Sequence, residues 1–211
     1  MEVGNDLSNL IVISDKDSKK ALDCLRYGLN RFYQCDGYLM KNNTSERSMV
    51  FRIAHYMSNW METDLKNYDL DVEYNRYTLS LNGKPESNPK RAILTKQASS
   101  IKNTNEQDEN IEEVLFVPDI IIHSRGVNEC NLAAIEFKKS RAGKKKIEFD
   151  KVKLTVLTQS KEFHYKKGFL VVLGHKAYEI SSFEHGKEIE TIEESFKMGQ
   201  NNQSFNKQYR D

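Results

Sequence analysis

The sequence has few of the residues that mark several specialised protein classes. Its 211 residues include three cysteines, three prolines and one tryptophan. Cys24, Cys35 and Cys130 are odd in number and lack metal-ligand spacing, which indicates free thiols in a reducing cytoplasm. No apolar run approaches the roughly 20 residues of a membrane span. Met1–Asn9 lacks the basic start of a signal peptide. We therefore expect a cytoplasmic protein without a membrane partner.

The sequence also lacks an excess of either charge. Lys and Arg total 32 and Asp and Glu total 31, so the formal net charge is +1. The composition is therefore not strongly basic and does not by itself indicate nucleic-acid binding. Any contact with nucleic acid must use a local patch. With 38% hydrophobic residues the chain can bury a core, and its length suits one domain.

The clearest pattern lies between Val117 and Lys139. Two apolar, β-branched segments flank a connection containing Gly and Asn, which is typical of an antiparallel hairpin. If the turn is centred between Val127 and Asn128, Asp119 lies opposite Glu136, with Cβ atoms about 5 Å apart. Lys138 shares a face with Glu136. Two carboxylates this close cannot both stay ionised without a cation, so the pattern favours a divalent metal with oxygen ligands.

These residues resemble the PD-(D/E)xK nuclease superfamily. Pro118-Asp119 matches one half of its motif and Glu136-Phe137-Lys138 the other. The resemblance covers about residues 45–174 and implies an α/β, restriction-endonuclease-like fold, with a central mixed sheet of about four strands flanked by helices. It also implies a hydrolase in which Asp119 and Glu136 bind Mg²⁺ or Mn²⁺, and Lys138 helps to orient the attacking water and to offset negative charge. The alternative is an ordinary surface hairpin, since Glu-x-Lys triplets are common in chains rich in Lys and Glu.

Two further glutamates are candidate site residues. Glu46 heads the apolar stripe of a helix expected from Ser45 to about Met61, so it should point inward. It either complements the helix dipole or supplies a third metal carboxylate, which we favour. Glu73 is either an acid at the metal edge or half of an ion pair with Arg76 or a Lys. The resemblance supports the first interpretation, because an uncharacterised nuclease-like group carries a similar Glu-Tyr-Asn-Arg run.

A basic run follows the second half of the motif. It comprises Arg141, Lys144, Lys145 and Lys146. Such a run is usually a solvated loop, but here it could hold a phosphate backbone beside the metal. Asp150 is an N-cap candidate for a helix to about Lys161, in which Lys153 could face the site. His123 shares a strand face with Asp119 and is either a site neighbour or an ordinary polar residue at a strand end.

Together these features predict one nuclease-like domain over residues 1–211. Residues 1–44 should form an N-terminal helical extension, 82–110 a flexible insertion and 199–211 a frayed tail, with a terminal helix over Glu188–Phe196. The expected activity is metal-dependent phosphodiester hydrolysis, on DNA in preference to RNA. The rival is an inactive nuclease-fold module that binds nucleic acid or a protein. Endonuclease or exonuclease action and a homodimer stay open. No Gly-rich phosphate loop, catalytic triad or zinc cluster competes.

Overall fold

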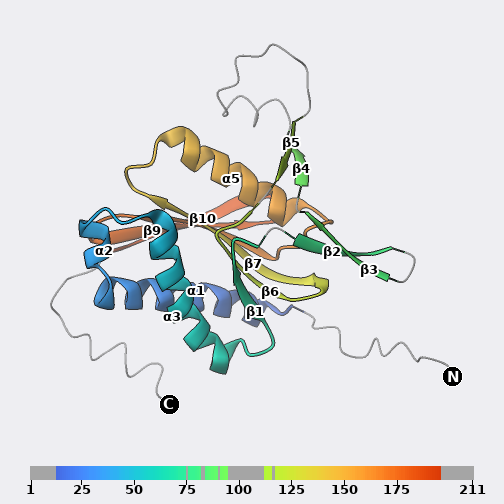
Figure 1. Ribbon diagram of the computed structural model, residues 1–211, viewed down its shortest axis with the longest axis horizontal. Helices are drawn as coiled ribbons and strands as arrows, with labels where there is room; N and C mark the ends of the chain where they lie inside the picture. The colour runs from blue at the N-terminus through green and yellow to red at the C-terminus, as the bar shows by residue number, and fades with distance from the viewer. Residues whose placement is uncertain are drawn as a thin grey trace, which may run out of the picture.

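The computed structural model describes the backbone of residues 13–74, 76–81, 84–89, 91–94, 112–115 and 117–195, with side chains for 13–74, 117–126 and 130–195. These residues form a mixed α/β fold (Figure 1). The helices are α1 (Asp15–Cys35), α2 (Tyr38–Lys41), α3 (Glu46–Asp64) and α5 (Lys144–Gln159). The strands are β1 (Asp69–Val72), β2 (Arg76–Leu81), β3 (Lys84–Pro89), β4 (Arg91–Leu94), β5 (Glu112–Leu115), β6 (Ile120–Ser124), β7 (Val127–Lys139), β8 (Lys167–Leu173), β9 (Ala177–Glu184) and β10 (Lys187–Ser195).

The central sheet has six strands in the order β1-β6-β7-β8-β9-β10. Neighbouring strands are antiparallel except β7 and β8, which are parallel. A parallel pair needs a crossover connection, and α5 supplies it. The element order from α3 through β1, β6, β7 and α5 to β8 agrees with the order expected from the sequence. The expected count of about four strands is corrected to six, because β9 and β10 extend the sheet.

Helices cover both faces of this sheet (Figure 1). α1 and α3 pack together over one face, with side chains such as Leu25, Phe32 and Ile53 completely buried. α5 covers the other face through Leu154 and Leu157. α1 therefore packs into the hydrophobic core, and it is the helix predicted within residues 1–44. No described helix is long and apolar enough to cross a membrane.

The β6–β7 hairpin turns earlier than predicted but keeps the predicted register where the motif lies. The turn is Arg125–Gly126, with Ser124 opposite Val127 and Gly126 at a φ of +79°. Two register shifts then place extra residues in β7, so that Ile120 lies opposite Ile135. Continuing this register by one residue brings Asp119 opposite Glu136. The bulges compensate for the error in the predicted position of the turn.

Two predicted segments differ from the structure. The helix expected over Glu188–Phe196 is wrong, because β10 pairs with β9 along nearly its whole length. The insertion at 82–110 contains two regular strands, β3 and β4, which pair with β2 and β5 in separate two-stranded sheets. The rest of that insertion and the predicted tail at 199–211 lie outside the described residues.

Candidate active site

Charged side chains from both layers of helices meet at the end of β7. We call this group the motif cluster: Glu46 at the start of α3, Asp119 just before β6, Glu136 and Lys138 on β7, and Asp150 and Lys153 on α5. Five of these six were candidate site residues from the sequence. Asp150 was not.

Two carboxylates of the motif cluster are fixed by the backbone of β7. β6 begins opposite Ile135, so the later N–H groups on that edge of β7 have no partner in β6. Phe137 N donates to Asp119 Oδ2 at 2.7 Å, and Lys139 N donates to Glu46 Oε2 at 3.1 Å. A strand edge needs such acceptors. The inward direction expected for Glu46 is therefore found, and both carboxylates lie where the hairpin opens.

Lys138 lies between three oxygen acceptors. Its Nζ is 2.8 Å from Asp150 Oδ2 and 3.3 Å from Glu46 Oε1, and it donates to Phe137 O at 2.8 Å. Burial alone would lower the pKa of Lys138, but Asp150 above all, and then Glu46, raise it beyond its ordinary value. Lys138 therefore stays a cation, which suits a residue that offsets negative charge.

Glu136 is the most deeply buried carboxylate of the motif cluster. Its side chain is 2% exposed, and Lys153 Nζ lies 2.6 Å from its Oε1. The same Nζ is 3.1 Å from Asp150 Oδ1. Burial raises the pKa of Glu136 to about 8, with Lys153 opposing the shift and Asp150 and Asp119 adding to it. Burial also raises the pKa of Asp119. Both motif acids are thus short of positive charge despite their lysine neighbours.

The motif cluster has the oxygen donors that a divalent cation prefers, but its side chains are not arranged as a preformed metal site. Among the described residues, no three His, Cys, Asp or Glu side chains lie close enough together to form a metal site. Both carboxylate oxygens of Glu46 already have partners, Lys138 Nζ and the backbone N of Lys139. Asp119 Oδ1, however, has no hydrogen-bond partner among the described residues, and Glu136 is its neighbour across the hairpin. Mg²⁺ is commonly held by one or two carboxylates together with several waters, and Asp119 with Glu136 fits that pattern.

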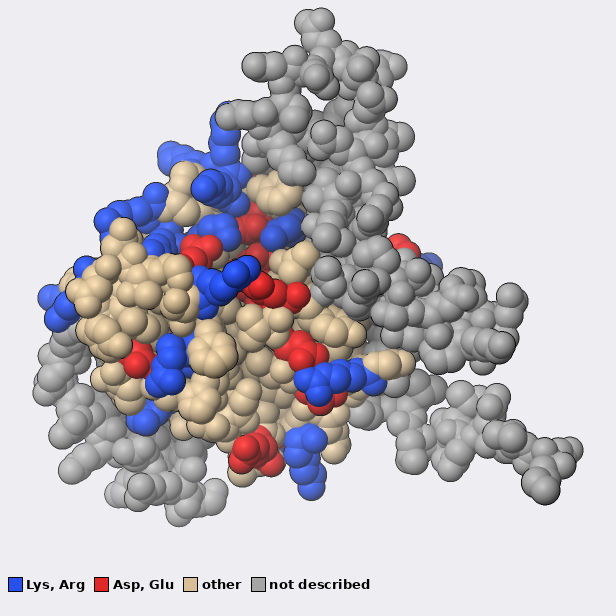
Figure 2. Space-filling view, in the orientation of Figure 1, with Lys and Arg blue, Asp and Glu red and all other residues tan. Residues whose placement is uncertain are grey.

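A basic pocket opens beside the motif cluster. It has a volume of about 530 Å³ and is lined by Asn43, Glu46, Lys138, Lys139, Arg141, Ala142 and Lys146. In Figure 2, Lys and Arg side chains gather at the upper left, over the start of α5, with acidic side chains among them towards the centre. Arg141 Nη2 donates to Asn43 Oδ1 at 3.3 Å. The basic run thus adjoins the site, although Lys144 and Lys145 do not line the pocket.

The lysines of this run lie in a helix, not in the solvated loop considered from the sequence. Lys144, Lys145 and Lys146 form the first turn of α5, whose N-cap is Gly143 without a side-chain cap. Positive charge at a helix N-terminus opposes the helix dipole. The N-terminus of the helix and its three cations nevertheless both attract anions.

Asp150 is a site residue that sequence reasoning missed. Asp150 was expected to be the N-cap of a helix, but it lies within α5, and it is 3% exposed. Asp150, Lys153, Leu154 and Leu157 repeat with helical spacing, which places them on the face that covers the sheet. This spacing was the available signal. It was obscured because the helix was expected to begin at Asp150 itself.

Glu73 and His123 are not part of the motif cluster. Glu73 accepts hydrogen bonds from Arg47 Nε and Nη2 at 2.7 and 3.0 Å, so it is in an ion pair with Arg47. The side chain of Arg76, one of the expected partners, lies outside the described residues. His123 lies at the turn end of β6, with its Nε2 2.8 Å from Asp71 Oδ2. Four residues of extended strand, about 13 Å, separate it from Asp119.

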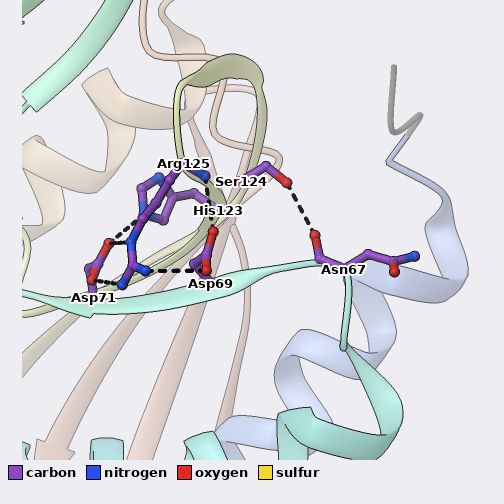
Figure 3. Close-up of polar contacts among 6 residues, drawn as sticks. All are labelled: Asn67, Asp69, Asp71, His123, Ser124 and Arg125. Carbon is purple, nitrogen blue, oxygen red and sulfur yellow. Dashed lines mark hydrogen bonds and ion pairs between the residues drawn. The ribbon is translucent and has the colours of Figure 1, made fainter. Parts of the chain in front are cut away.

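His123 belongs to a second group, which we call the turn cluster (Figure 3): Asn67, Asp69, Asp71, His123, Ser124 and Arg125. Arg125 binds Asp71 through Nε at 2.9 Å and Nη2 at 2.5 Å, and its backbone N donates to Asp69 Oδ2 at 3.1 Å. Ser124 Oγ donates to Asn67 O at 3.2 Å. These bonds attach the hairpin turn to β1, so the turn cluster is a structural clamp.

Comparisons with known proteins leave the family open. No protein-family model matches the chain, and no curated protein matches it either. The fold is mixed α/β, and the motif resemblance rests on the residues described above.

Proposed function

We propose that the chain is a metal-dependent nuclease that hydrolyses phosphodiester bonds, with the motif cluster as its active site. One observation carries the proposal. Asp119, Glu136 and Lys138 lie together at the open end of one hairpin, with Glu46 beside them and a basic pocket adjoining. The raised pKa values of the fully buried Glu136 and the half-buried Asp119, beside an open pocket, support a functional site.

In this proposal each residue has a distinct role. Asp119 and Glu136 would hold a Mg²⁺ or Mn²⁺ ion, which would supply Lewis-acid activation of water and neutralise phosphate charge. Lys138 keeps a proton on Nζ and stabilises negative charge as it develops on the phosphate oxygens. Glu46 orients Lys138 through Oε1 and holds the end of β7 through Lys139 N. Asp150 holds Lys138 from the opposite side.

The basic pocket is where the substrate backbone would bind. Arg141 and Lys146 line it directly, and Lys144 and Lys145 continue the positive charge along the first turn of α5. With a net charge of only +1, the chain depends on such a local patch for phosphate contacts. DNA is the preferred substrate class in this proposal, carried over from the motif resemblance.

A binding module without catalysis is the second candidate. It is favoured by the ion pairs of the motif cluster, since Lys138 and Lys153 already pair with Glu46, Glu136 and Asp150. Such a module would use the basic pocket to bind nucleic acid without need of a metal.

Cleavage of labelled single- and double-stranded DNA and RNA, with Mg²⁺, Mn²⁺ or EDTA, separates the two candidates. The nuclease proposal predicts cleavage that requires the metal and falls at least about 100-fold in Asp119→Asn, since a ligand charge is lost. Asn retains an acceptor for Phe137 N. Metal-independent binding without cleavage of any substrate would favour the binding module.

A further inference from the structure

Lys153 occupies an unusual position for a residue outside the recognised motif. It comes from α5, on the layer opposite α3, and its side chain is 12% exposed. Its Nζ lies 2.6 Å from Glu136 Oε1. A contact this short, to a carboxylate that is itself 2% exposed, places a full positive charge directly against a proposed metal ligand.

The ammonium group of Lys153 is held in place on several sides. Asp150 Oδ1 lies 3.1 Å from Nζ, one helical turn away on the same face of α5. The Phe149 ring lies beneath it, with its centroid 5.9 Å from Nζ. Asp150 is anchored in turn by Lys138. If Lys153 moved away, the buried Glu136 would lose its ion-pair partner, which is unfavourable, whereas Asp150 would keep Lys138.

Enzymes that cleave phosphodiesters with two metal ions hold the ions about 3.5–4 Å apart, with carboxylates shared between them. Glu136 would have to be such a shared ligand here, because it is the innermost acid of the hairpin. Lys153 already pairs with Glu136 from the α5 side. A second ion on that side would have to displace the ammonium or bind next to a like charge.

We infer that Lys153 takes the place of a second metal ion, so that the motif cluster holds one divalent cation per chain. The inference rests on the proposed function, since it concerns the same site. Asp119, whose Oδ1 has no hydrogen-bond partner among the described residues, and Glu136 would hold that one ion, while Lys153 keeps its contact with Glu136. Lys153 is thus a positioning residue that fixes Glu136 and limits the number of ions.

Counting bound Mn²⁺ on metal-stripped protein without substrate tests the inference, by calorimetry and by the electron paramagnetic resonance signal of free Mn²⁺. Wild type and Lys153→Arg, which keeps the charge, should each bind one ion per chain. Lys153→Met should bind two, because the second position loses its cation. The matched control is Lys167→Met, which removes an ion pair of the same length with Glu184 and should leave one ion.

The possible outcomes distinguish failure of this inference from failure of the proposed function. Two ions in wild type, or one ion of unchanged affinity in folded Lys153→Met, would overturn the inference while leaving a metal-dependent nuclease intact. No bound ion in wild type would overturn the proposed function together with the inference. Circular dichroism checks that each variant is folded. If Lys153→Met does not fold, the wild-type stoichiometry decides alone.

Discussion

The β6–β7 hairpin carries a charged cluster at each end, and the two are built differently. At the turn cluster, hydrogen bonds from Arg125 above all, and from His123, lower the pKa of Asp71, although partial burial opposes them. At the motif cluster, burial raises the pKa values of Asp119 and Glu136 despite two lysines nearby. The pKa values of carboxylates are thus shifted in opposite directions at two ends of one hairpin that are only about 13 Å apart.

The difference indicates what each end is for. Ionised Asp71 stabilises the fold by attaching the turn to β1. Ionised Glu136 costs folding free energy, because its burial is not fully compensated. Proteins retain such uncompensated groups at functional sites more than elsewhere. A cation that enters the motif cluster would relieve this cost, whereas the turn cluster has no need of one.

The largest expected effect is that of Asp150→Ala on stability. It leaves Lys138 and Lys153 without their shared carboxylate, and breaking a buried ion pair costs about 3–5 kcal/mol. Asp71→Ala at the turn cluster should cost less, about 1–2 kcal/mol, because Arg125 is 58% exposed and can be solvated. Urea unfolding of both variants measures this. Equal losses would mean that the two clusters do not differ as described.

Glu136→Gln should change how stability depends on pH in the metal-free protein. The folded pKa of Glu136 is raised from 4.5 to about 8. The stability that protonated Glu136 contributes to the folded state is therefore fully present below pH 4.5 and is lost as pH rises to 8. Gln does not ionise and avoids this loss. The variant should match wild type in acid and exceed it by on the order of 2 kcal/mol at pH 8.5. A difference that is constant with pH would contradict the assignment.

Asp71→Asn should show the opposite dependence. The folded pKa of Asp71 lies below its ordinary 3.8, so its contribution is present above that value and is lost as pH falls through the folded pKa. The variant should be less stable than wild type by about 1 kcal/mol at pH 6, with the gap closing towards pH 2. Unfolding curves across this range test the sign. A gap that widens in acid would be the contrary result.

The smallest effect on the fold is expected from replacing Lys144, Lys145 and Lys146 by Ala. Removing cations from the first turn of α5 should stabilise the helix by a few tenths of a kcal/mol. Nucleic-acid binding should nevertheless weaken, and the slope of log affinity against log salt should fall by about 0.7–0.9 per lost phosphate contact.

Replacing the exposed Lys161, Lys176 and Lys187 by Ala gives a control with the same change of net charge. Equal effects of the two triple variants on the salt slope would leave the basic run without a specific role.

The motif part of the fold could be predicted because its signals are local. The helix that begins at Glu46 and the strands around Ile120 and Ile135 can each be recognised from the spacing of apolar residues within one short segment. The register between Asp119 and Glu136 was correct although the turn was placed two residues too late, since bulges in β7 restore it.

The errors arise where local patterns mislead. Ile189 and Ile192 are three residues apart, which is typical of a helix. A bulge between Glu188 and Glu190 shifts the alternation of β10, and this shift produces the spacing. The β9–β10 turn at His185–Gly186, with both φ angles positive, has the form of a tight hairpin turn that the sequence did not make evident.

Asp150 shows a different limit of sequence reasoning. A basic run such as Lys144–Lys146 is usually a solvated loop, so Asp150 was assigned to the N-cap of the helix that followed. Lysines in a first helical turn also oppose the helix dipole. Packing of Leu154 and Leu157 against the sheet outweighs this local preference. The contact between Asp150 and Lys138 depends on the β7–α5 packing, which no local pattern specifies.

The most direct test of the difference between the two ends is thermal unfolding during titration with Mg²⁺ or Mn²⁺. Wild type and Asp71→Asn should both show a saturable rise in Tm, equivalent to about 2.7 kcal/mol at 100 times Kd. Asp119→Asn should show none, because it removes a ligand charge from the motif cluster only. No rise in wild type, or an equal rise in Asp119→Asn, would contradict a metal site at the motif cluster.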